Sequence, residues 1–68
     1  MSKIGKRLKD ERLKLGLSLQ YMEEKTGVNA AYIYRIEEGE RKNPSIKIIK
    51  RICDFYKLDF IEIIYLMV

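Results

Sequence analysis

Histidine and tryptophan are absent from this chain of 68 residues, and cysteine occurs only once, at Cys53. A single cysteine cannot form a disulfide within one chain, and without histidine the usual zinc ligand sets cannot be assembled. The Ser-His and Cys-His catalytic arrangements are excluded for the same reason. We therefore expect no enzymatic activity, no metal and no cofactor. We interpret Cys53 as a buried, inert thiol rather than a redox sensor.

Long apolar runs are also missing from the sequence. No segment approaches the length needed to cross a membrane, and the start, MSKIGKRLKD, has no apolar signal segment. We expect a cytoplasmic protein with no membrane partner. Because the ending YLMV is strongly apolar, Val68 can be either the natural C-terminus or a boundary within a longer protein.

The length and charge favour one small domain with a polyanionic partner. The chain is long enough for a single domain, residues 1–68, and 47% of its residues are hydrophobic, so it should fold. Lys and Arg number 14 against 10 Asp and Glu, which gives a net charge of +4. This excess suits nucleic acid, although an ordinary soluble domain can carry it as well.

Apolar residues recur at helical spacing along the whole chain. The pattern predicts helices over about 3–15, 19–26, 30–38, 46–56 and 60–66, which together form one compact all-α domain. The last segment, FIEIIYLMV, is rich in β-branched residues and could suit a strand, but no second strand is present to pair with it. The residues on the inward phases are Ile4, Leu8, Leu15, Met22, Val28, Ile33, Ile36, Ile46, Ile49, Ile52, Cys53 and Tyr56.

The second and third predicted helices are short and joined by a tight turn. Capping residues and glycines mark their ends, namely Ser18, Thr26, Gly27, Asn29 and Gly39. Two short helices joined in this way, here about 18–38, form a helix-turn-helix. In such a unit the second helix lies in the major groove of DNA.

Several stretches of the chain match a known signature. They are IGKRLKDER, LSL, KTGV, IYRIEEGERKNPS and the apolar positions of the fourth helix, and they span about Ile4 to Ile64. In these stretches the chain resembles the Xre-type, lambda-repressor-like DNA-binding domain. The resemblance implies a five-helix fold and sequence-specific binding of double-stranded DNA as a transcriptional regulator. We expect a repressor, because nothing in the sequence resembles an activation surface.

The resemblance places base-reading positions at Asn29, Ala30, Ala31 and Arg35. Arg35 can bridge O6 and N7 of guanine, or else remain solvated or pair with a nearby glutamate. Ala30 and Ala31 can pack on thymine methyl groups, or they can simply favour the helix. Asn29 is first a helix cap and only second a phosphate contact.

Contacts to the DNA backbone are expected around these positions. We expect one of Tyr32 and Tyr34 to reach a phosphate, preferably Tyr32, and the other ring to cover the core. The family's phosphate-binding Gln corresponds to Leu19 here, which leaves its neighbour Gln20 as the candidate. A basic loop after the recognition helix could straddle a phosphate strand or be merely solvated, and it consists of Arg41, Lys42 and Asn43.

Glutamates near the presumed DNA face favour a different class of partner. They are Glu23, Glu24, Glu37, Glu38 and Glu40, and together they would repel phosphate if all were exposed. The family usually has Ala at the position of Glu23, where two helices cross closely. A glutamate there must point outward or open the crossing. The alternative function is therefore a protein-interaction module, such as an antitoxin-like subunit or one that binds a protein antirepressor.

Two opposite charges fall on inward helical phases. Arg12 follows Leu8 by four residues, and Glu37 follows Ile33 by four. Because a lone buried charge is very costly, the two should meet. The resemblance also implies an ion pair at these positions, so we interpret Arg12 and Glu37 as structural.

The last predicted helix, about 59–66, carries more apolar residues than one face can bury in so small a domain. Exposed apolar residues in such number favour an interface. We expect a homodimer with a contact centre formed by Ile61, Ile64 and Tyr65, with Phe55 from a non-inward face of the fourth helix beside it. Two-fold symmetry would place two recognition helices about 34 Å apart and select a palindrome. Alternatively, a further C-terminal segment covers these residues.

Overall fold

The computed structural model describes residues 2–40 and 44–67. Over these residues the chain forms five α-helices and no strand, so the predicted all-α fold is confirmed and the strand considered for the last segment is not formed. Each helix begins and ends within one residue of its predicted bounds. The helices are α1 (Lys3–Lys14), α2 (Leu19–Thr26), α3 (Ala30–Glu37), α4 (Ile46–Tyr56) and α5 (Phe60–Tyr65).

Short polar side chains begin the helices, as the capping pattern predicts. The Ser2 hydroxyl accepts a hydrogen bond from Gly5 N, and the Ser18 hydroxyl accepts one from Tyr21 N, each at 3.0 Å. Gly27 ends α2 with a φ of 77°, a conformation that residues with a Cβ rarely adopt. This turn is what lets α3 start so soon after α2.

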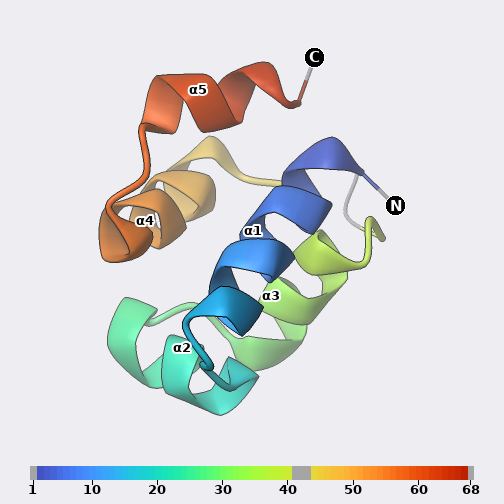
Figure 1. The fold of residues 1–68 in the computed structure, drawn as a ribbon. Helices are drawn as coiled ribbons and strands as arrows, with labels where there is room; N and C mark the ends of the chain where they lie inside the picture. Colours follow the sequence, from blue (N-terminus) through green and yellow to red (C-terminus); the bar gives the residue numbers. More distant parts are fainter. Residues whose placement is uncertain (1, 41–43, 68) are drawn as a thin grey trace.

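The helices are arranged so that the helix-turn-helix and α5 occupy opposite ends of the molecule (Figure 1). α1 packs on α3, α2 packs on both α3 and α4, and α5 packs on α4. The side chains at the centre come from every helix and from the α2–α3 turn. They are Ile4, Leu8, Met22, Val28, Ile33, Ile36, Ile49, Ile52, Cys53, Tyr56 and Ile63.

Gly5 sets the contact between α1 and α3. A Cβ at Gly5 would lie 2.3 Å from the carbonyl oxygen of Ile36 and 2.8 Å from that of Glu37. No side chain fits in this space, so the two helix backbones touch here. This contact fixes the C-terminal end of α3 against the start of α1.

Two residues predicted to be buried are exposed. Leu15 follows the last helical residue of α1, so the chain turns away before its side chain can continue the inward line. Ile46 is the first residue of α4, and it lies at the edge of the face formed by Ile49, Ile52 and Tyr56. In both cases the sequence predicts the helical phase correctly. The side chain is nevertheless exposed, because the residue lies at an end of its helix.

Candidate nucleic-acid interface

The outer face of α3 carries Ala31, Tyr34 and Arg35. Ile33 and Ile36 are buried on the opposite side, and this packing turns the other three side chains to solvent. Ala31 adds almost no bulk, so a partner could approach the backbone closely at that point. Arg35 supplies the positive charge of this face, which we call the α3 outer face.

Arg35 is not used inside the fold. Its side chain is exposed, and none of the hydrogen bonds or ion pairs among the described residues involves its guanidinium. Glu38, one of its alternative partners, instead accepts a hydrogen bond from Lys9 Nζ at 2.9 Å. The bond to Glu38 also raises the pKa of Lys9.

The two tyrosines of α3 lie in different environments. The Tyr32 ring packs against the core, and its hydroxyl oxygen accepts a hydrogen bond from Ser45 N at 3.3 Å, which ties α3 to the start of α4. The Tyr34 side chain is 48% exposed. The packing therefore favours Tyr34 over Tyr32 for an outside contact, the reverse of the preference drawn from the sequence.

The first turn of α3 is closed by two polar side chains. Asn29 Oδ1 accepts hydrogen bonds from Ala31 N at 2.8 Å and from Tyr32 N at 3.4 Å, so Asn29 is a helix cap. Glu23 Oε1 accepts one from Ala30 N at 2.7 Å. Glu23 is an exposed residue of α2, and its carboxylate extends to the first turn of α3. Of the two outcomes expected for a glutamate at this helix crossing, the side chain therefore takes the outward position.

Arg12 and Glu37 form a bidentate ion pair between α1 and α3. Arg12 Nε donates to Glu37 Oε2 and Nη2 donates to Oε1, each at 2.9 Å. The third guanidinium nitrogen, Nη1, donates to the carbonyl oxygen of Leu17, also at 2.9 Å. The hydrogen bond to Glu37 raises the pKa of Arg12. The Tyr56 hydroxyl is buried near this pair, and burial raises its pKa.

These bonds change the electrostatics predicted for the DNA face. Glu37 forms an ion pair with Arg12, and Glu38 forms one with Lys9. Glu23 accepts a hydrogen bond from the α3 backbone. Glu24 and Glu40 remain exposed. Two of the five glutamates of the predicted acidic cluster are thus neutralised by ion pairs, while Glu23, Glu24 and Glu40 keep an exposed charge.

The remaining predicted DNA contacts lie before and after α3 in the sequence. Gln20 is exposed in the first turn of α2, whereas Leu19 beside it is partly buried and packs against the core. The predicted basic loop, Arg41, Lys42 and Asn43, lies outside the described residues. In the sequence it follows Glu40, which lies beyond the end of α3 at Glu37.

Three of the four residues predicted for a dimer interface lie on α5, at the other end of the molecule. Ile61 is 61% exposed and Tyr65 is 70% exposed on α5, while Ile64 is partly buried. Phe55 packs edge-on against Tyr21, with the ring centroids 6.4 Å apart, so it faces α2. Ile61 and Tyr65 are therefore the outermost of the four.

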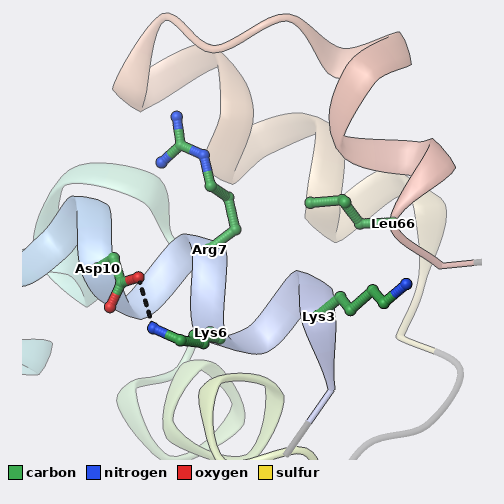
Figure 2. A pocket seen from close by; sticks show the side chains of 5 residues that line it. All are labelled: Lys3, Lys6, Arg7, Asp10 and Leu66. Carbon is green, nitrogen blue, oxygen red and sulfur yellow. Dashed lines mark hydrogen bonds and ion pairs between the residues drawn. The ribbon is translucent and has the colours of Figure 1, made fainter.

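A shallow hollow lies between α1 and the end of α5 (Figure 2). Its volume is about 290 Å³, and it is lined by Lys3, Lys6, Arg7, Asp10 and Leu66. Lys6 Nζ donates to Asp10 at 3.0 Å and Arg7 donates to Glu11 at 2.9 Å, so two of its three cations are already paired. The hollow does not reach the α3 outer face.

Two classes of site are not seen in the described part of the chain. No helix there is long and apolar enough to cross a membrane. No group of three or more residues of the metal-binding types gathers there either. Cys53 is buried and unbonded, and burial raises the pKa of its thiol.

The chain was compared with known proteins. The family described as helix-turn-helix matches residues 8–63. The HTH-type transcriptional regulator SinR of Bacillus subtilis (strain 168) is 39% identical over 49 residues, which cover 72% of this chain and 44% of SinR. A glutamine–fructose-6-phosphate aminotransferase of Methanocaldococcus jannaschii is 37% identical over 62 residues, or 91% of this chain but only 6% of that enzyme. The chain thus spans less than half of each of these two relatives.

Solved structures agree with this assignment. The N-terminal DNA-binding domain of SinR from Bacillus subtilis superimposes with a TM-score of 0.81 at 31% identity, covering 90% of this chain and 88% of that one. A crystal structure of SinR, the master regulator for biofilm formation, in complex with DNA gives the same TM-score and identity and covers 97% of that chain. The family match includes all of α2 and α3 and most of the core. This chain belongs to the helix-turn-helix family, as its sequence signature predicted.

Proposed function

We propose that this domain binds double-stranded DNA in a sequence-specific manner and acts in the cytoplasm as a transcriptional regulator, specifically as a repressor without enzymatic activity. The observation that carries the proposal is the α3 outer face. Ala31 allows a close approach to base edges, and Arg35 is exposed with no partner among the described residues. In a helix-turn-helix such a face enters the major groove.

Neighbouring residues supply backbone contacts in this proposal. The Tyr34 and Gln20 side chains are exposed, and their hydroxyl and amide groups can donate to phosphate oxygens. In the sequence, a basic loop follows α3. Its Arg41 and Lys42 would neutralise phosphates on one strand, and the Asn43 amide would donate to a phosphate oxygen. The SinR relative solved in complex with DNA supports DNA binding by this domain.

A homodimer is part of the same proposal. Ile61 and Tyr65 are large, apolar and exposed at the end of the domain opposite α2. Pairing of two copies through α5 would cover these side chains and leave both α3 outer faces open. Two α3 helices about 34 Å apart would then select a palindromic operator.

The second candidate function is a protein-interaction module whose partner, such as an antirepressor, binds this α5 face. The exposed Ile61 and Tyr65 favour it, and Glu24 and Glu40 would disfavour DNA nearby. We prefer DNA binding because Glu37 and Glu38 are held in ion pairs, which reduces their repulsion of phosphate.

Selection of bound duplexes from random DNA tests the proposal. We expect the 68-residue chain to enrich a palindromic sequence and to lose affinity steeply as salt rises, because several phosphates are neutralised. Recovery of the input distribution at every salt concentration would reject sequence-specific binding and favour the protein-interaction module.

A further inference from the structure

The first turn of α3 has no backbone donor to offer a phosphate. Ala30 N donates to Glu23 Oε1, Ala31 N and Tyr32 N donate to Asn29 Oδ1, and Ile33 N donates to the Asn29 carbonyl oxygen. In many proteins these amides form an anion site. Here a carboxylate from α2 and an amide oxygen fill it, so this end of α3 does not attract phosphate.

Glu23 brings a second acceptor to the same place. Its Oε1 is held by Ala30 N at 2.7 Å, which fixes the carboxylate at the end of α3. The other oxygen, Oε2, has no hydrogen-bond partner within residues 2–40 and 44–67, and the side chain is exposed. The fold therefore presents one fixed, negatively charged acceptor beside Ala30 and Ala31.

The chemistry of this acceptor selects its partner on DNA. A carboxylate oxygen repels phosphate and the acceptor atoms of guanine and thymine, but it accepts a hydrogen bond from an exocyclic amino group. Cytosine N4 is such a donor, and only one acceptor, O6 of the paired guanine, lies beside it in the major groove. Adenine N6 lies next to the acceptor N7, so a carboxylate fits cytosine better.

We propose that Glu23 is a specificity-determining residue whose Oε2 accepts a hydrogen bond from N4 of a cytosine in each half-site. The inference rests on the proposed function and adds to it the identity of one base. It assigns to α2 a base-reading residue that reaches the groove beside Ala30, in addition to the α3 outer face.

The isosteric change Glu23→Gln gives a sharp test. The glutamine carbonyl oxygen keeps the bond from Ala30 N, because the NH2 group in its place would face another donor. The outward atom then becomes a donor instead of an acceptor. Selection from random DNA should therefore replace one cytosine per half-site by guanine or thymine. In titrations, the original duplex should lose about fivefold to tenfold in affinity relative to the exchanged duplex.

Glu24→Gln is the matched control. It removes the same charge from the next residue of α2, which is also exposed, and it should leave the selected sequence unchanged. If Glu23→Gln selects the same base as wild type at every position, the inference is overturned, even when all duplexes bind more tightly through reduced repulsion. A wild-type chain that selects no sequence overturns the proposed function as well, so the two failures are distinguishable.

Discussion

Arg12 and Glu37 lock α1 to α3 through two parallel hydrogen bonds of 2.9 Å, and the Glu37 side chain is only 1% exposed. The arginine is nearly as buried, at 11%. Because Arg12 Nη1 also holds the Leu17 carbonyl, one guanidinium connects α1, α3 and the chain entering α2. The orientation of the α3 outer face therefore depends on this pair.

Substituting one member of the pair should lower the free energy of unfolding more than substituting both members. We expect Glu37→Leu or Arg12→Met alone to lower the free energy of unfolding by about 3–5 kcal/mol, because the remaining charge stays buried without its partner. The double variant should cost much less, although the Leu17 carbonyl stays unpaired in it. Urea denaturation of the two single variants and the double variant measures these differences.

An exposed pair on the same helix serves as the control. Lys6 and Asp10 are joined at 3.0 Å, with 66% and 58% of their side chains exposed. Lys6→Met should therefore change the free energy of unfolding by only about 0–1 kcal/mol. If the free energy of unfolding fell equally and only slightly in all the Arg12 and Glu37 variants, the pair would not behave as a buried ion pair.

The sequence was sufficient to predict features that depend on local patterns. Helical spacing gave all five helices, and the residue type at Asn29 gave the cap of α3. The juxtaposition of Arg12 with Glu37 also followed, because two inward charges must find each other. The helices and the cap follow from the residue pattern of each helix by itself. The ion pair follows from the high free-energy cost of burying a charge without a partner.

Features that depend on how two helices cross could not be predicted. The close backbone contact at Gly5, where an added Cβ would lie 2.3 Å from the Ile36 carbonyl oxygen, exists only because α3 directs that carbonyl at this point of α1. The bond from Ala30 N to Glu23 likewise depends on the distance between α2 and the start of α3. Tyr32 and Tyr34 flank the buried face of α3 on opposite sides, and only the position of α4 decides that Tyr32 is the one covered.

Arg35 and Arg41 should affect DNA binding in different ways. Arg35→Ala should weaken binding to the selected duplex by about 1–3 kcal/mol and leave non-specific binding nearly unchanged, because a bidentate contact to guanine is lost. Arg41→Ala should weaken both kinds of binding and reduce the salt dependence, as for a phosphate contact. Fluorescence titrations with selected and scrambled duplexes separate the two effects. An unchanged preferred sequence in Arg35→Ala would show that Arg35 does not read bases.

Tyr56 should make the domain less stable in alkali. Burial raises the pKa of its hydroxyl above the ordinary value of about 10, so the unfolded chain loses this proton at a lower pH than the folded chain. The contribution to stability is full below pH of about 10 and is lost as the pH rises further. Burial also raises the pKa of Cys53, which acts in the same direction.

The variant Tyr56→Phe isolates the tyrosine part of this effect. The hydroxyl is buried and has no hydrogen-bond partner among residues 2–40 and 44–67, so its removal should leave stability at pH 7 unchanged or slightly increased. The loss of stability between pH 7 and pH about 11 should become smaller than in wild type. Tyr34→Phe, at an exposed tyrosine, is the control for thermal melts at both pH values. A large destabilisation of Tyr56→Phe at pH 7 would contradict an unpaired hydroxyl.

The α5 face offers the test of the proposed dimer. Ile61 is the better position for a charge than Ile64, because Ile64 also packs against the core and its replacement would unfold the domain. We expect Ile61→Glu to shift sedimentation from dimer to monomer and to weaken binding to a palindrome much more than to a single half-site. Leu13→Glu changes a similarly exposed apolar residue on α1 and should leave the dimer intact. A wild-type chain that stays monomeric at high concentration, and also when bound to DNA, would instead favour coverage of Ile61 and Tyr65 by another segment or partner.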